Sequence, residues 1–362
     1  MTNHMPGSGR SPVAIRTPHD LVSAVPYLLG FHPENSLVVI GTGGPSGTCA
    51  MRIDLPPAGA AAKDVGEQLA EMLERNGFPC ALLVGYGPAE RVTPLVDAVR
   101  PALSERAVEL GDALRVTGGR FWSYVCAAPE CCPADGTPFD ITTSVVAAQA
   151  TLEGQVVLAD RTELARTVAP LGGLARELMR LATGRAEDRL FGWMRDEPDA
   201  AAVRSRMVAA GLPLVREVVG RAGRGAGLPA DDEIAWLGVL LTHVRVRDEA
   251  WVRIGLEERL DAQVGCWRDV VRRVEEPYVA APACLLAYAA FSAGDGGLAN
   301  VALERAIDAD PGYSMAHLLH GLIATGAPPS TVRLSMTPAD LADAYREDAD
   351  PGGDLGIERR AS

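Results

Sequence analysis

Three thiols lie within seven residues of one another, in the segment Cys126-Ala-Ala-Pro-Glu-Cys131-Cys132-Pro133. Thiolates are zinc ligands, but a structural zinc site usually takes four ligands, often from two Cys-x2–4-Cys pairs. One four-residue gap is present here, and no second pair follows. Zinc held by Cys126, Cys131 and Cys132 is therefore one hypothesis, and no other cofactor is predicted. The alternatives are a reactive thiol with a lowered pKa and a Pro-rich structural turn with buried cysteines.

A second group of residues lies further toward the N-terminus. The loop from His32 to Ser36 contains an imidazole, the carboxylate of Glu34 and a hydroxyl. Histidine titrates near neutral pH and can act as a base or a ligand. Arg52 and Asp54 are two residues apart on a predicted strand, so they share one face of the sheet. The catalytic candidates are therefore His32, Glu34, Arg52 and Asp54; the alternatives are capping residues and a surface ion pair.

Other motifs do not support a named reaction. The run Gly41-Thr42-Gly43-Gly44 follows a strand, but a phosphate-binding loop needs a helix directly after its glycines. A second strand is predicted instead, which favours a hairpin turn. His317 and His320 can share a helix face, but a third metal ligand is missing. The sequence also lacks Gly-x-Ser-x-Gly and His-Glu-x-x-His.

The charge of the chain limits its partners. The net charge is −13 and the pI is about 5.0, so nucleic acid and anionic membranes are repelled unless a basic patch overrides this field. The best patch, Arg216, Arg221 and Arg224, contains Glu217 and no aromatic residue, which is typical of a solvated helix end. We therefore expect a protein or small-molecule partner, and neither nucleic acid nor membrane.

Cysteine usage and the N-terminus predict a cytoplasmic protein. Seven cysteines at irregular spacing favour a reducing compartment. Residues 1–12 lack the apolar segment of a secretory signal, and no apolar run approaches the roughly 20 residues of a membrane span. Lys63 is the single lysine among 34 basic residues, which we attribute to a GC-rich genome.

The elements that are expected to position these residues divide the chain into two parts. Apolar alternation and helical spacing over residues 16–157 give the order β-β-α-β-α-β-β-α, typical of an α/β layer with a mixed sheet. The predicted strands cover residues 36–40, 49–55, 80–84, 113–116 and 121–126; the helices begin near residues 17, 60, 93 and 141. Residues 1–15 are predicted to form a disordered leader.

Residues 158–346 are predicted to be all-helical, with a disordered tail over 347–362. The segment 283–311 has the pattern of a tetratricopeptide-like helix pair, in which close crossing requires small residues at fixed offsets. Ala287, Ala290, Ala299 and Ala306 occupy those offsets, and Leu303 occupies the large apolar position. A plain helical hairpin is the alternative. One pair is fewer than the roughly three repeats of a free-standing array, so we expect it to pack on upstream helices.

Several segments together resemble a known family. The sequence Pro26-Tyr-Leu-Leu-Gly-Phe-His-Pro33 leads into Ser36-Leu-Val-Val39 and then Arg52-Ile-Asp-Leu-Pro56. These segments are similar to the domain-of-unknown-function 4192 family of actinobacteria. Trp122-Ser-Tyr124, the cysteine segment, Gly136-Thr-Pro138 and the stretch 299–313 resemble the same family, so that the resemblance spans about residues 17 to 325. The family has no assigned activity to transfer.

Two functional hypotheses follow. The first is a ligand- or partner-binding module whose helical half contacts other proteins, because the helix pair is present and catalytic signatures are missing. The second is an enzyme whose site forms where the His32–Ser36 loop, Arg52 with Asp54, and the Cys126–Cys132 loop converge. The second hypothesis requires these three segments to meet in space.

Overall fold

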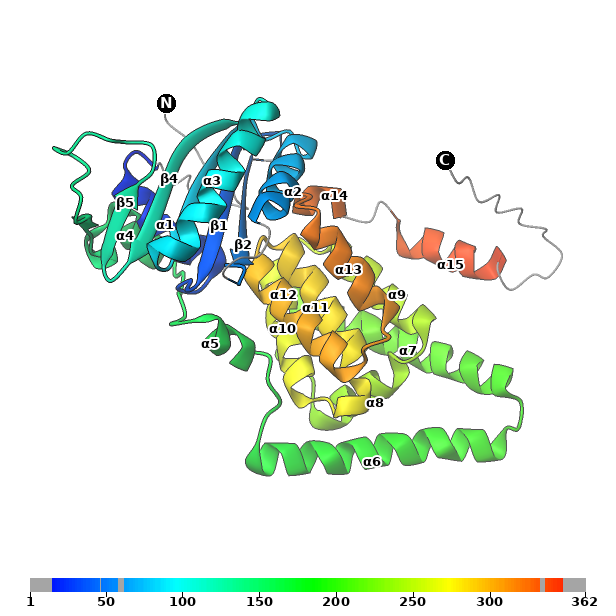
Figure 1. Cartoon of the computed structure of the whole chain (residues 1–362). Coiled ribbons are helices and arrows are strands. Elements are labelled where there is room, and N and C mark those ends of the chain that lie inside the picture. The colour runs from blue at the N-terminus through cyan, green and yellow to red at the C-terminus, as the bar shows by residue number, and fades with distance from the viewer. Residues whose placement is uncertain (1–14, 46, 58–61, 333–335, 348–362) are drawn as a thin grey trace. The chain divides into compact units, whose positions relative to one another are not determined.

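The computed structural model describes residues 15–45, 47–57, 62–332 and 336–347, which divide into two compact units (Figure 1). The first unit contains the described residues up to Thr167 together with 293–301 and 317–332. The second contains 168–292, 302–316 and the described residues from 336 onward. The predicted α/β half followed by a helical half is confirmed. The predicted disordered leader and tail fall almost wholly outside the described residues, and the predicted boundary at 157/158 stays a prediction.

A six-stranded mixed sheet forms the frame of the first unit, in the order β2-β1-β3-β4-β5-β6. Neighbouring strands are antiparallel except β3 and β4, which are parallel because α3 carries the chain back between them. The strands are β1 (Ser36–Gly44), β2 (Gly47–Asp54), β3 (Cys80–Tyr86), β4 (Glu109–Thr117), β5 (Arg120–Ser123) and β6 (Thr137–Pro138).

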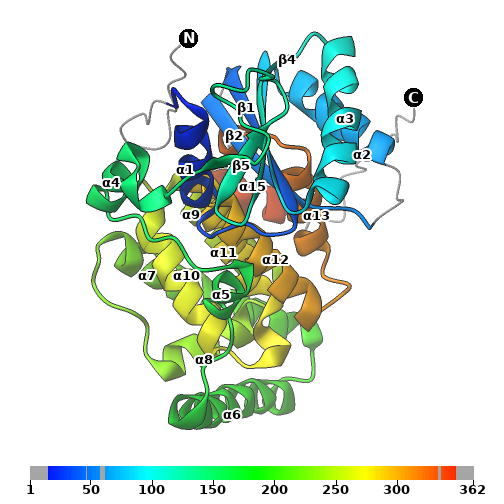
Figure 2. The same cartoon turned by 60° about the vertical axis from the view of Figure 1, so that its left-hand side comes forward.

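Helices cover both faces of this sheet. In Figure 2, α2 (Ala62–Arg75) and α3 (Ala89–Glu105) lie on one face and α1 (Pro18–Leu29) on the other. Alternate residues of β1, such as Leu37 and Val39, pack with α2 and α3 in one buried cluster. The remaining helices of the segment are α4 (Val145–Leu152), α5 (Arg161–Arg166) and a 3-10 turn (Ile141–Thr143).

Thr17 caps the start of α1, near the residue where the sequence predicts a helix to begin. Thr17 Oγ1 accepts a hydrogen bond from the Asp20 amide at 3.1 Å, and the Thr17 amide donates to Asp20 Oδ2 at 3.0 Å. This reciprocal pair satisfies two amides that the helix itself leaves free. Gly30 ends the helix at φ +79°.

The third helix differs from the expectation. The sequence predicts a start at Thr93-Pro94, but α3 begins at Ala89 and contains both Pro94 and Pro101. The two prolines are seven residues apart and both are exposed. The carbonyls that they leave without an N–H donor therefore lie on the hydrated face of the helix, where water can bond them.

The glycine run after the first strand forms a hairpin, as predicted. β1 continues through Gly44 and pairs with β2 on its return. A Cβ atom added at Gly41 or Gly44 would lie 2.7 or 2.6 Å from the ring of Phe78. These glycines therefore allow an aromatic ring to pack directly against the strand backbone.

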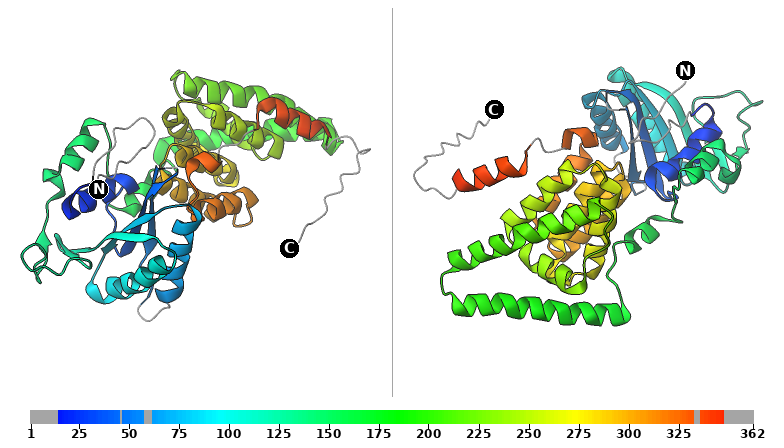
Figure 3. Two further views of the ribbon diagram at one scale, coloured as in Figure 1. Left: turned by 90° about the horizontal axis from the view of Figure 1, so that it is seen from above. Right: turned by 180° about the vertical axis from the view of Figure 1, so that it is seen from behind.

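The second unit is helical. It is built from α6 (Gly173–Asp196), α7 (Ala200–Gly223), α8 (Asp231–Leu240), α9 (Val244–Leu256), α10 (Leu260–Arg273), a 3-10 turn (Glu276–Tyr278), α11 (Ala280–Ser292) and α15 (Pro338–Glu347). A short connection joins α6 and α7, the two long green helices in the right-hand panel of Figure 3. α11 is buried all round, as expected of a helix with apolar residues on every face. None of the described helices is both long enough and apolar enough to span a membrane.

The chain continues from α11 through α12 (Gly296–Ala309), α13 (Ser314–Ala324) and α14 (Pro329–Val332). α11 and α12 are consecutive helices with Gly294 at φ +84° in the turn between them, and the tetratricopeptide-like character of the pair stays a prediction. Ala287, Ala290 and Leu303 are fully buried, as small and large positions of a tightly packed helix should be. α12 and α13 each contribute residues to both units.

Candidate functional site

The loop that joins β5 to β6 brings the three cysteines together. The hydroxyl of Ser123, the last residue of β5, accepts hydrogen bonds from the amides of Val125 and Cys126 at 3.2 and 3.0 Å. The Ala128 carbonyl then accepts from the amides of Cys131 and Cys132 at 3.2 and 2.8 Å. These two turns reverse the chain twice, so that all three side chains meet.

Side chains of the sheet hold the C-terminal end of this loop. Trp122 Nε1 donates to the Ala134 carbonyl at 3.0 Å, and Arg120 Nη1 donates to the Gly136 carbonyl at 2.7 Å. The guanidinium of Arg115 stacks on the Trp122 ring at 3.7 Å from its centroid. Gly136 has φ +81°, and a Cβ atom there would lie 2.5 Å from the indole. Only glycine therefore allows this approach without displacing the ring.

The sulfur positions suit a metal ion. Cys126 Sγ lies 3.1 Å from Cys131 Sγ, which lies 3.6 Å from Cys132 Sγ, and all three lie within 4.8 Å of one another. A tetrahedral zinc ion with Zn–S bonds of about 2.3 Å separates its sulfurs by about 3.8 Å. A disulfide would require about 2.05 Å. The three thiols can therefore converge on one ion, and all of them are accessible to solvent.

The three thiols differ in how readily they ionise. A hydrogen bond from the Cys131 thiol, supported by the Ala128 amide, lowers the pKa of Cys126. The same contact raises the pKa of Cys131, and hydrogen bonding to Cys126 together with burial raises that of Cys132 to about 12. Cys126 is thus the first thiol to ionise, and a metal ion must displace whatever protons the three thiols still carry, including those of the two thiols with a raised pKa.

The second group of candidates forms a clamp between β2 and the loop before β1. Arg52 Nη2 lies 2.6 Å from Asp54 Oδ1 and donates to the Glu34 carbonyl at 3.3 Å. The side chains of His32 and Glu34 are exposed, and the His32 amide donates to the Leu158 carbonyl at 3.0 Å. The structure thus joins Arg52, Asp54 and the backbone of Glu34, while the His32 backbone bonds a different segment.

The strand register separates this clamp from the cysteine loop. Arg52 pairs with Val38, Val38 with Val84, Val84 with Leu114, and Leu114 with Ser123. Ser123, where the cysteine loop begins, is therefore four strand spacings from Arg52, or about 19 Å. The three segments of the enzyme hypothesis do not form one site among the described residues.

Comparison with known families identifies the family to which the chain belongs. The sequence model of one family, described as "Domain of unknown function (DUF4192)", matches residues 18–330. The protein belongs to the DUF4192 family. No curated protein and no solved structure matches this DUF4192 chain. The match includes both the clamp and the cysteine loop, so both are features of the DUF4192 region itself.

The residues that position the cysteine loop of this DUF4192 protein were not identified from the sequence. Trp122 and Gly136 belong to the segments that carry the resemblance, but the contact of their side chain and backbone was not foreseen. The stacking of Arg115 on Trp122 can be predicted from the sequence. The Gly118-Gly119 turn between two predicted strands sets a register in which Arg115 lies opposite Trp122, as observed.

Proposed function

We propose that this DUF4192 protein is a binding module whose α/β unit holds a zinc ion through Cys126, Cys131 and Cys132. The convergence of three thiol sulfurs within 4.8 Å, in a loop anchored by Trp122 and Arg120, carries the proposal. Soft thiolates select zinc over harder divalent cations such as magnesium and calcium. Three protein ligands leave the fourth position of a tetrahedral ion to an external ligand.

The helical unit contributes the protein-interaction surface of this module. Leu174, Leu178 and Leu181 of α6 are 74%, 45% and 62% exposed. Their spacing of four and three residues places them on one face of the helix, while Met179 and Ala182 face the interior. A row of exposed leucines is costly in water unless another surface covers it. The proposed tetratricopeptide-like pair fits the same role, because such pairs serve as protein-binding scaffolds.

The proposal also accounts for the cysteines and the composition. All seven cysteines are described as free thiols, and a reducing cytoplasm keeps metal-binding thiols available. We therefore place the protein in the cytoplasm, and its Arg-rich, Lys-poor composition supports an actinobacterial host. The net charge of −13 supports a protein or small-molecule partner over nucleic acid or membrane.

Elemental analysis of the untagged, full-length protein purified under reducing conditions tests the metal site. We expect about one zinc ion per chain. Cys126→Ser and Cys131→Ser should each lose most of the zinc while changing the melting temperature of the metal-free protein little, because the loop is exposed. Calorimetric titration in buffers of different ionisation enthalpy should show at least two protons released per zinc ion near pH 7, from the two thiols with a raised pKa.

Cys80→Ser is the matched control, because Cys80 is a free thiol on β3 and belongs to no metal-ligating cluster among the residues that the structure describes. This variant should keep its zinc. Protein that contains no zinc and takes up none on titration would contradict the proposal. A Cys126–Cys131 disulfide, detected by mass spectrometry in protein without metal, would replace it with a redox function.

A further inference from the structure

A pocket in the helical unit has a concentration of positive charge that the metal proposal does not use. It has a volume of about 610 Å³ and is walled by α7, α9 and α15. This volume is in the range of small-molecule sites. Arg204 of α7, His243 and Arg245 at the start of α9, and Arg346 of α15 line it together with Tyr345, and no lining residue is acidic.

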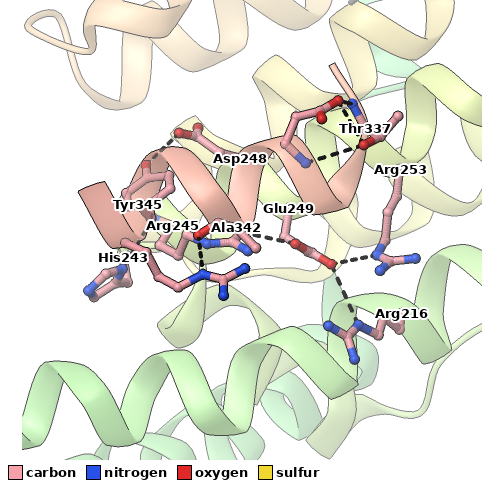
Figure 4. A network of polar contacts seen from close by, with 11 residues as sticks. Arg216, His243, Arg245, Asp248, Glu249, Arg253, Thr337, Ala342 and Tyr345 are labelled. Carbon is pink, nitrogen blue, oxygen red and sulfur yellow. Dashed lines mark hydrogen bonds and ion pairs between the residues drawn. The ribbon is translucent and has the colours of Figure 1, made fainter. Parts of the chain in front are cut away.

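The charges next to the pocket are not balanced. Glu249 is fully buried and interacts with three guanidiniums, those of Arg245, Arg253 and Arg216, at 2.9, 2.7 and 3.5 Å (Figure 4). One carboxylate therefore neutralises only one of three guanidiniums, and the cluster around Glu249 has an excess of two positive charges. Arg204 adds another, since no ion-pair partner is found for it within the described part of the chain. In a chain of net charge −13, such an excess creates a local field that attracts anions.

Arg245 supplies donors from a buried position. Its side chain is 7% exposed, and it donates one hydrogen bond, from Nη1 to Glu249 Oε2. A guanidinium has five N–H donors, and the described residues accept one of those of Arg245. Because Arg245 also lines the pocket, its remaining donors are available there. None of the Arg245 nitrogens is a buried atom without a partner, so its remaining donors reach the open space of the pocket, where water or a ligand can accept from them.

Specific contacts hold α15, one of the three helices that wall the pocket, against α9. Tyr345 OH donates to Asp248 Oδ2 at 2.7 Å, and the Arg245 guanidinium lies 5.2 Å from the centre of the Tyr345 ring. These bonds fix α15 against α9, as Figure 4 shows. Arg346 is paired with Asp343 on the same helix. The cationic side chains thus approach the pocket from three separate helices.

We propose that this pocket binds a small organic molecule through its phosphate group, with Arg204, Arg245 and Arg346 as the recognising side chains. A tetrahedral phosphate presents oxygens in several directions, which suits guanidiniums that arrive from three helices better than a planar carboxylate does. The apolar lining, which includes Val208 and Ala342, has room for the organic part. The site lies in the helical unit and does not depend on the metal proposal.

Calorimetric titration of the full-length protein with phenyl phosphate and pyrophosphate tests the site at constant ionic strength, with sulfate and citrate as competing anions. We expect saturable binding of both phosphates and weaker binding of citrate. Arg204→Gln and Arg346→Gln should each weaken binding about tenfold, since each removes a charge-assisted hydrogen bond. Both arginines are exposed, so these variants should fold normally.

Arg195→Gln is the matched control, because this side chain on α6 is 81% exposed and lies outside the pocket. It removes the same charge from the same unit and should change affinity less than about twofold. Hydrogen exchange should also slow in α15 on addition of phenyl phosphate. Absent binding, equal weakening in all three variants, preferential binding of citrate, or unchanged exchange in α15 would each overturn the proposal.

Discussion

Gly136 illustrates how one residue without a side chain positions the cysteine loop. Gly136→Ala should weaken zinc binding about tenfold, because an alanine at φ +81° is strained by roughly 1–2 kcal/mol. Its Cβ atom would also displace the Trp122 ring that anchors the loop. Competition with a chromogenic zinc chelator measures the change in affinity.

Gly119→Ala provides the comparison for this variant. Gly119 has φ +71° in the neighbouring β4–β5 turn, and a Cβ atom there would meet no atom within 4 Å. The substitution carries the conformational strain without the displacement of Trp122. We expect both variants to lose similar stability and Gly136→Ala alone to lose zinc affinity. Equal zinc affinity in the two would show that the Trp122 contact does not position the thiols.

At the scale of the elements, Glu249 ties α9 to α7 through Arg216 and therefore makes the helical unit sensitive to pH. Burial would raise the pKa of Glu249, but hydrogen bonds from Arg245 and Arg253 outweigh this effect, and the pKa is lowered. A lowered carboxyl pKa contributes stability above the unfolded value near 4.5, and this stability is lost as the pH falls through the folded-state pKa.

Glu249→Gln should therefore lower the free energy of unfolding by about 3 kcal/mol at pH 7, because it leaves the buried Arg245 guanidinium without its counter-charge. The difference from wild type should begin to shrink as the pH falls below the unfolded-state value near 4.5, and it should vanish once the pH has passed below the lowered folded-state pKa of Glu249. Urea denaturation across this pH range measures it. Glu217→Gln, at a 54% exposed position, should change stability by less than about 0.5 kcal/mol. A difference that does not vary with pH would contradict the charge argument.

At the scale of the whole molecule, the net charge of −13 disfavours polyanionic partners, and the leucine row of α6 is the surface at which we propose that a protein partner binds. A photo-crosslinking residue in place of Leu178 should give one discrete protein adduct in cell extract, whereas the same residue in place of Arg180, 61% exposed on the same helix, should not. Mass spectrometry of the adduct distinguishes a second copy of this chain from another protein. Identical labelling from both positions would contradict a specific surface.

Much of the architecture was predictable because its causes are local. The helix start near residue 17 and the glycine hairpin depend on residues within a few positions of one another. The start of α3 was misplaced because Pro94 normally marks a first helical turn, and whether a later proline is tolerated depends on which helix face is hydrated. The sequence does not predict β6, because a two-residue strand forms only where the edge of an existing sheet offers it hydrogen-bonding groups.

By itself, the sequence determined the order of strands and helices, the separation into an α/β half and a helical half, and the proximity of three thiols, because a seven-residue spacing confines them to one loop. The tertiary structure alone decided which distant residues meet. Strand register placed Arg52 about four spacings from the cysteine loop, and helix packing gathered Arg204, Arg245 and Arg346 around one pocket. No local spacing encodes such contacts, since they depend on how the whole chain closes on its core.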